Sequence, residues 1–232
     1  MRFDFSVIIN AWPLFASGLL VTVTFCAVSS VLGLCFAVPI ALAQLSRRLW
    51  WRLPARVLVE VIRDTPFLVQ VFVIYFVLPA SGVPISTTAA GILALSLYGA
   101  VYFSESLRGA ILSVPKGQVD AARATGMSYV QAMRRIVFPQ MLGYAIPPLA
   151  NQVIGLIKDS AVLSIIAVPE LTMAFQNVLG TTFAAPEAFV AVSVLYWALT
   201  SVVALGMARL ERLTPTHRSM RQSTLLLAAA DR

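Results

Sequence analysis

Charged residues inside apolar stretches are the residues of this sequence that could do chemistry. One such stretch carries Glu60, Arg63 and Asp64. On a helix, Glu60 and Arg63 are close enough to pair, whereas Asp64 lies over Glu60 at the spacing that repels like charges. Pro66 cannot donate a backbone hydrogen bond, which leaves the carbonyl of Ile62 without its helical partner. Charges of both signs beside free carbonyls would suit a zwitterion, whose ammonium needs acceptors and whose carboxylate needs donors.

A structural role for these charges is equally open. A charge in an apolar helix costs about 2.5 to 3.5 kcal/mol, so each one needs an explanation. If Arg63 lies near the cytoplasmic edge, its long side chain reaches water and pairs with Glu60 only to hold the helices together.

Lys158 and Asp159 present the same choice in a later apolar stretch, since they can pair with each other across subunits or face a pathway. Asn151 follows Pro147-Pro148 by one helical turn, where we expect the prolines to break the helix and make the backbone irregular. Its amide could bind a ligand there, although hydrogen bonding between helices is the simpler role.

A polar, helix-forming segment interrupts the apolar sequence at Asp120-Ala-Ala-Arg-Ala-Thr-Gly126. Pro115 favours a helix start and Gly126 a helix end. Ser128 and Gln131 have the spacing of a capping box, which predicts a second helix. Two short helices meeting at a glycine, with alanines on their surface, would let another protein approach the backbone closely. The alternative is an ordinary helical connector.

The composition predicts an integral membrane protein. Of 232 residues, 59% are hydrophobic and only 12% are charged, against about a quarter charged in soluble domains. Four charge-free intervals are each long enough for a span of roughly 20 residues, and one holds two spans because 78–84 reads as a turn. We therefore expect an all-α protein with five transmembrane helices, at about 14–45, 57–78, 88–112, from 136, and 188–208.

Arginine and lysine residues predict the orientation of these helices. They gather in three regions, around 47–56, around the polar segment at 108–135, and from residue 209 onward, whereas the expected opposing loops at 80–88 and 171–186 contain none. By the positive-inside rule the three basic regions are cytoplasmic and the amino terminus lies outside. The amino end lacks a signal-peptide pattern, so the first helix is expected to stay. Residues 158–170 are too short to span twice, and we expect them to pack against the membrane-embedded body.

Several function classes lack support in the sequence. It contains no Gly-x-x-x-x-Gly-Lys-Ser/Thr phosphate loop, so this chain should not hydrolyse ATP. Cys26 and Cys35 lie in one apolar run and are expected to pack rather than to form a disulfide or bind metal, and the only histidine, His217, lies in the basic tail. The net charge of +7 is distributed as expected for membrane topology, not for nucleic-acid binding.

The polar segment resembles the EAA loop of ABC importer permeases, in which Glu-Ala-Ala is followed after three residues by Gly and, nine residues later, by Ile-x-Leu-Pro. Here Asp120 replaces Glu and Phe138 replaces Leu. A second stretch, Glu60-Val-Ile-Arg-Asp-Thr-Pro-Phe-Leu-Val-Gln70, is similar to the Arg-Gly-Thr-Pro-Leu-Leu-Val-Gln segment of the polar amino acid permeases, with Asp64 in place of Gly. The Lys158-Asp159-Ser160 region and the residues around Glu105 also match that group, so the likeness extends from Gly18 to Glu211.

The resemblance implies a single permease domain over 1–232, of the type I (MetI-like) fold, with a coupling loop at about 113–135 and a cytoplasmic tail at about 212–232. It implies a substrate pathway formed by Glu60, Arg63, Asp64, Thr65, Pro66, Tyr102, Asn151, Lys158, Asp159 and Ser160. It implies an ATPase-coupling surface formed by Gln118, Asp120, Ala121, Ala122, Arg123, Gly126, Met127 and Ser128.

The same resemblance implies partners in a bacterial inner membrane. These are two ATPase subunits that carry ATP and Mg, a second permease subunit, identical or paralogous, and an external amino acid-binding protein. The sequence leaves the cargo open among polar amino acids and opine-like derivatives. Two other classes stay possible on the residues alone: an ion-coupled secondary carrier and a nontransporting membrane scaffold.

Overall fold

The computed structural model describes residues 3–212, and the regular structure in this range is entirely helical. The helices, in chain order, are α1 (Phe5–Leu45), α2 (Leu49–Asp64), α3 (Phe67–Phe72), the π-helix η1 (Val73–Val77), α4 (Leu78–Ala80), α5 (Thr87–Ser113), α6 (Lys116–Ala124), α7 (Tyr129–Ala132), the π-helix η2 (Met133–Val137), α8 (Phe138–Asp159), the 3₁₀-helix η3 (Ser160–Ile166), α9 (Leu171–Thr182) and α10 (Ala185–Arg212). The predicted tail and His217 lie outside the described residues.

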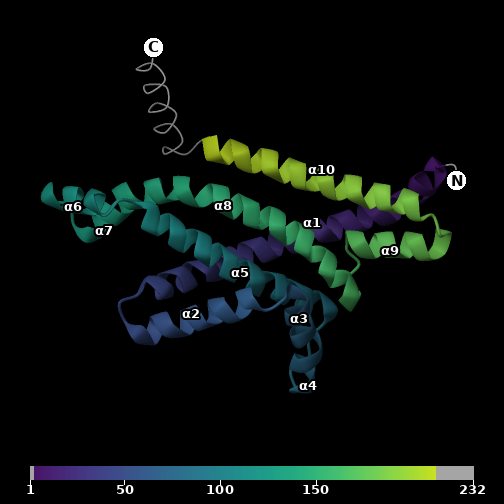
Figure 1. Cartoon of the computed structure of the whole chain (residues 1–232), viewed down its shortest axis with the longest axis horizontal. Helices are drawn as coiled ribbons and strands as arrows, with labels where there is room; N and C mark the ends of the chain where they lie inside the picture. Colours follow the sequence, from purple (N-terminus) through teal and green to yellow (C-terminus); the bar gives the residue numbers. More distant parts are fainter. Residues whose placement is uncertain (1–2, 213–232) are drawn as a thin grey trace, which may run out of the picture.

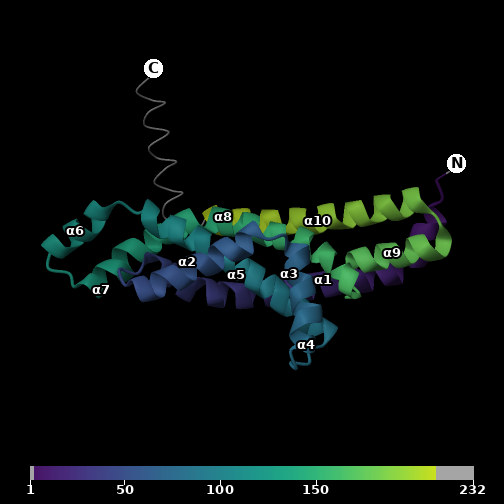
Figure 2. The same ribbon diagram turned by 60° about the horizontal axis from the view of Figure 1, so that its bottom comes forward.

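The long helices form an elongated bundle (Figure 1). α1, α5, α8 and α10 run along its length, whereas the α3 to α4 segment stands across it (Figure 2). The amino terminus and α9 lie at one end of the bundle, and α6 and α7 lie at the other. Within residues 3–212, four helical segments are long and apolar enough to cross a membrane, and a fifth span results if α2 and Phe67–Ala80 count together.

The second predicted span is not one kinked helix. Its two halves meet at Thr65 and Pro66 with a bend of 108°. Thr65 is extended (φ −104°, ψ 139°), the conformation that a following proline favours. The carbonyl of Ile62 is not free as expected, because the side-chain amide of Gln70 donates to it at 2.7 Å.

Proline has the opposite outcome in α8, where the predicted break is wrong. Pro147 and Pro148 lie inside one continuous helix. Each removes only one backbone donor, and in an apolar environment the neighbouring peptide groups have no water to bond with instead. The helix around Asn151 is therefore regular.

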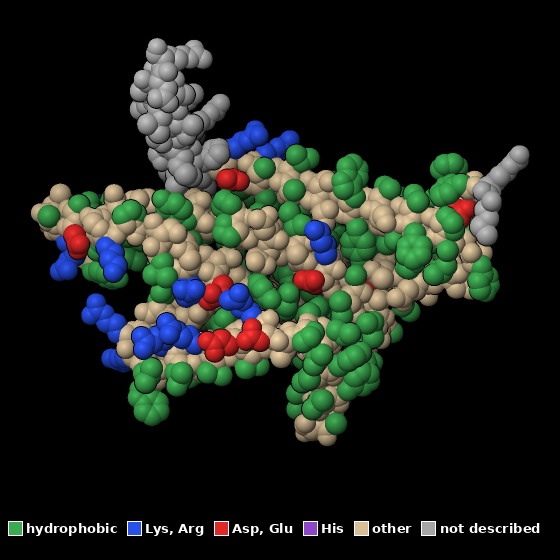
Figure 3. Space-filling view, in the orientation of Figure 1, with side chains coloured by type: hydrophobic (Ala, Val, Ile, Leu, Met, Phe, Trp, Pro, Cys, Tyr) green, Lys and Arg blue, Asp and Glu red, His purple; other side chains and the backbone are tan. Residues whose placement is uncertain are grey.

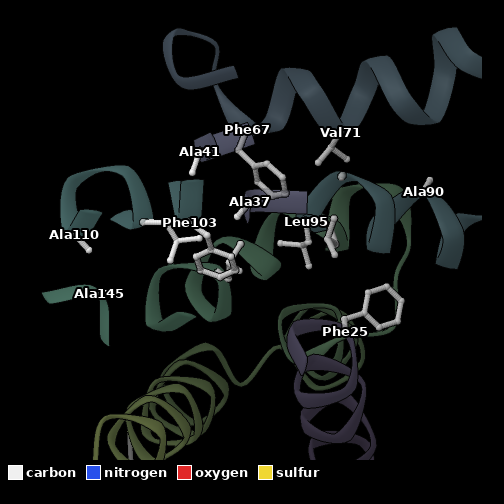
Figure 4. Close-up of a cluster of buried hydrophobic side chains, with 14 of the residues drawn as sticks. Phe25, Ala37, Ala41, Phe67, Val71, Ala90, Leu95, Phe103, Ala110 and Ala145 are labelled. Carbon is white, nitrogen blue, oxygen red and sulfur yellow. The ribbon is translucent and has the colours of Figure 1, made fainter. Parts of the chain in front are cut away.

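Two clusters of buried apolar side chains hold the bundle together. The larger one joins α1, α3, α5, α8 and η3, with Phe103 and Leu95 among its members (Figure 4). Small residues let α1 and α5 approach closely: a Cβ on Gly33 would lie 3.2 Å from the backbone nitrogen of Ala100. The burial of η3 in this cluster confirms that 158–170 packs against the body.

The smaller cluster joins α1, α9 and α10 around Phe15, and α9 occupies a region that we expected to be a loop. Glu170 is fully buried and caps α9, accepting from the backbone N–H groups of Thr172 and Met173 and from the hydroxyl of Tyr196. Thr22 of α1 accepts from the backbone N–H of Leu171. Both the first and the last long helix thus contact the start of α9.

Candidate functional site

Arg63 forms its ion pair with α5, not with its own helix. Its Nη1 lies 3.5 Å from Oε2 of Glu105, and Glu105 also binds Arg108 through two hydrogen bonds of 3.0 and 2.9 Å. The predicted pairing of Arg63 with Glu60 is wrong: within residues 3–212, neither Glu60 nor Asp64 forms an ion pair, and both are exposed. One carboxylate between two guanidinium groups makes a compact mixed-charge cluster at the junction of α2 and α5.

Aromatic rings extend from this cluster along α5. The guanidinium carbon of Arg63 lies 6.0 Å from the ring centroid of Tyr102, within the range of a cation–π contact. The ring of Tyr102 is 4.6 Å from that of Tyr98, which in turn is 4.8 Å from Phe67. The row therefore links the charges to the larger core.

Lys158, Asp159 and Ser160 mark the junction of α8 and η3. Lys158 is exposed and lines an open groove of about 630 Å³, together with aromatic and hydroxyl side chains of α9 and α10 that include Thr172, Tyr196 and Trp197. Asp159 is half-buried near Tyr98. In the part of the chain that the structure describes, no ion pair joins Lys158 to Asp159. Ser160 is buried and donates to the carbonyl of Ile157.

The predicted pathway residues do not form one tight pocket. Acidic and basic side chains gather instead on one face of the bundle, over α2, α5 and α8, whereas hydrophobic side chains dominate α3, α4 and α10 (Figure 3). Asn151 is exposed on α8, and Thr65 and Pro66 are exposed at the break after α2. The arrangement is an open strip of charged side chains along this face of the bundle.

Glu105, Arg108 and Tyr98 were not among the predicted pathway residues. The signal for Glu105 and Arg108 was present, because they are charges inside an apolar helix at the favourable i, i+3 spacing. Tyr98 carried no such signal, since aromatic residues in apolar helices are usually core residues.

The coupling segment has the local geometry that the sequence predicted. α6 ends in a Schellman motif, in which the backbone N–H of Met127 donates to Ala122 and that of Gly126 donates to Arg123. Gly126 has φ +87°, a conformation that side chains rarely tolerate. Ser128 and Gln131 form the reciprocal capping box that starts α7.

Most of the predicted coupling residues are open to a partner. Gln118, Asp120, Ala121, Arg123, Gly126 and Ser128 are exposed, and Met127 is half-buried. Space is open around Gly126, where an added Cβ would meet nothing within 4 Å. Ala122 is the exception to the expectation of surface alanines, because it is 7% exposed and packs inward. Gln118 accepts from the side-chain amide of Gln140, which ties α6 to α8.

Comparisons with known proteins agree with this architecture. Residues 29–214 match the family model of the binding-protein-dependent transport system inner membrane component. The glutamine transport system permease protein GlnP of Escherichia coli is 37% identical over 218 residues, which cover 91% of this chain and 98% of GlnP.

Solved structures show the same fold. A crystal structure of an amino acid ABC transporter with histidines superposes with a TM-score of 0.85 at 32% identity, covering 91% of this chain and 99% of that one. An inward-facing MetNI methionine ABC transporter superposes with a TM-score of 0.74 at 22% identity, over 87% and 96%. This chain therefore belongs to the family of binding-protein-dependent transport system inner membrane components, the permease subunits of ABC importers, and within it to the amino acid permeases.

Proposed function

We propose that this permease subunit carries a polar amino acid, or a derivative of one, and that the charged strip over α2, α5 and α8 lines its path. The observation that carries the proposal is the cluster of Arg63, Glu105 and Arg108, which the rings of Tyr102 and Tyr98 link to Asp159. A zwitterion needs donors for its carboxylate and acceptors for its ammonium, and the strip offers both within an apolar bundle.

The break after α2 supports this role for Thr65 and Pro66. Two carbonyls near the break, those of Val61 and Ile62, are already bonded to the hydroxyl of Thr65 and the amide of Gln70. The break therefore fixes the end of α2 and presents Arg63 toward α5, instead of offering bare carbonyls to the substrate. Tyr102 adds a ring beside Arg63, and Asn151 adds an amide on α8.

ABC importer permeases work with ATPase and binding-protein partners. For this chain we propose two ATPase subunits that hold ATP and Mg, an external binding protein, and a second permease subunit, identical or paralogous. The exposed face of α6 and the turn at Gly126 would enter a groove of the ATPase. We treat 1–232 as one permease domain, with the loop at 113–135 as the coupling element.

We propose an orientation with five spans, the amino terminus outside and the carboxyl end in the cytoplasm. Two observations support it. The coupling segment and the arginine-rich turn between α1 and α2 lie toward the same end of the bundle, and the amino terminus lies at the opposite end. The α2 to α4 pair then forms the broken fifth span.

Uptake into vesicles tests the proposal. The permease would be reconstituted with its ATPase and binding protein, and ATP-driven uptake of labelled basic, acidic and neutral amino acids would be compared. We expect ATP-dependent uptake of at least one of them, and its loss with Glu105→Gln while assembly is kept. Uptake driven by an ion gradient without any ATPase would favour a secondary carrier and contradict the proposal.

A further inference from the structure

The turn between α1 and α2 concentrates positive charge that the coupling surface and the pathway do not use. We call this region the arginine corner, defined as Arg47, Arg48, Arg52 and Arg56 together with Trp50 and Trp51. No acidic residue occurs from 47 to 59. Arg52 is half-buried and the other three arginines are exposed, and none of the four takes part in an ion pair within the described range.

An apolar surface accompanies these charges on the same helix. Trp50 is 90% exposed and Trp51 is 64% exposed, next to exposed Leu53 and Val57. Arg48, Arg52 and Arg56 recur every four residues and so form one stripe along α2. Figure 3 shows basic side chains gathered at this end of α2, with hydrophobic side chains along its outer edge.

We propose that the arginine corner binds the headgroups of anionic phospholipids in the cytoplasmic leaflet. Guanidinium groups match phosphate oxygens in geometry and charge, and tryptophans favour the boundary between headgroups and acyl chains. A basic amphipathic helix beside a membrane span has the pattern expected for recognition of anionic lipids. The proposal rests on the topology given above, which puts this turn on the cytoplasmic side.

A protein partner fits this surface less well than lipid does. An acidic face of the ATPase would neutralise the arginines. It would not cover the exposed apolar side chains of Trp50, Val57 and Val61. A bilayer covers both parts at once, with headgroups over the stripe and acyl chains over the edge. The corner also lies outside the α6 to α7 segment, which has its own exposed surface for docking.

Counting bound lipids tests the proposal. The full-length chain in detergent is titrated with phosphatidylglycerol or with phosphatidylcholine of identical acyl chains, and bound lipids are counted by native mass spectrometry. Each arginine near a headgroup contributes about fivefold in affinity at low salt. We expect phosphatidylglycerol to be favoured by about tenfold or more, with the preference falling as salt rises. Changing all four arginines to Gln should abolish the preference, whereas changing them to Lys should retain most of it.

A matched control removes four charges elsewhere at the same end, by changing Lys116, Arg123, Arg134 and Arg135 to Gln, and should leave the preference in place. Equal loss in both variants would mean that net charge alone acts, which overturns the proposal. It is also overturned if the wild type shows no preference, or if the fourfold Gln variant keeps it. If that variant does not elute as a folded species, the pair Arg47→Gln/Arg48→Gln should show a partial loss. The readout needs neither substrate nor ATPase, so failure of transport would not affect it.

Discussion

The coupling segment (residues 113–135) and the mixed-charge cluster are two polar regions of this membrane protein that are held in place by different means. In the coupling segment, the turn is fixed by contacts within about ten residues: the Schellman motif around Gly126 and the capping box at Ser128. In the cluster, Arg63 reaches Glu105, on a different helix. The turn of the first region is held by bonds within its own sequence, whereas the ion pair of the second forms only when α2 and α5 are packed together.

This difference suits two different tasks. In the proposed function, the turn at Gly126 must keep its shape against a partner, and local hydrogen bonds would provide that stiffness. The proposed pathway must respond when helices rearrange, and the ion pair between helices at 3.5 Å would be exchanged there for a substrate group. A change in the coupling segment should therefore affect docking, and a change in the cluster should affect transport without affecting docking.

The largest effect is expected at Gly126, where we compare Gly126→Asp with Gly126→Asn. Both side chains tolerate φ near +87° about equally, so they differ mainly in charge. An unpaired charge in a buried contact is strongly unfavourable, so Asp should lower co-purified ATPase by on the order of tenfold or more. Membrane insertion should be unchanged, and Asn should cause a smaller loss. Normal ATPase amounts with Gly126→Asp would contradict the docking role.

A smaller effect, on uptake, should distinguish Glu105 in the cluster from Glu60 outside it. Glu105→Gln leaves two guanidinium groups without their carboxylate, and we expect uptake to fall by about tenfold because charged hydrogen bonds are worth a few kcal/mol. Glu60→Gln should change uptake by less than about twofold, since Glu60 is exposed and pairs with no charge in the described residues. Similar losses of uptake in both variants, measured at equal amounts of assembled complex, would contradict a specific role for Glu105.

Gln70→Leu tests the hydrogen bond that stabilises the break after α2, next to the mixed-charge cluster. It removes the 2.7 Å bond to the carbonyl of Ile62 and leaves only the hydroxyl of Thr65 at 3.5 Å, which should lower the free energy of unfolding by about 1 to 3 kcal/mol. Gln118→Leu is the matched control, because Gln118 is exposed in the coupling segment, and its effect should stay within about 0.5 kcal/mol. Denaturant titration in detergent measures both. A greater loss of unfolding free energy with Gln118→Leu than with Gln70→Leu would contradict this prediction.

The smallest effect is expected at the capping box. Ser128→Ala removes the acceptor for the backbone N–H of Gln131, at a local cost of about 1 kcal/mol. Hydrogen exchange at that amide should become roughly fivefold faster, without a change in exchange within α5. Ser128→Thr should keep the protection. Faster exchange across the whole bundle would show that the segment is not locally stabilised.

The sequence predicted the local features well. We expected a span at 88–112, and α5 runs from Thr87 to Ser113. The glycine turn and the capping box were also predictable, because all of their hydrogen bonds join residues close in the chain. The partner of Arg63 was not predictable, since an i, i+3 carboxylate was available nearby and only the packing of α2 on α5 decides between Glu60 and Glu105.

The prolines show why the remaining features escaped prediction. Pro66 ends a helix where Thr65 and Gln70 supply substitute hydrogen bonds, whereas Pro147 and Pro148 remain inside α8. The residue type is the same, and the surroundings decide the outcome. α9 was missed for a similar reason: its cap and its apolar face depend on α1 and α10, which are distant in sequence.

The contacts of α9 have a consequence for how the protein is made. Thr22 lies 149 residues before Leu171, and the backbone N–H of Asp4 donates to Glu187, 183 residues later. A ribosome that delivers α1 to the membrane must therefore synthesise most of the chain before these bonds can form. Until then the Thr22 hydroxyl lacks Leu171 as its partner. The first helix therefore lies in the bilayer without these contacts until the end of the chain has been made. A chain truncated before α9 would lack the partners of both Thr22 and Asp4.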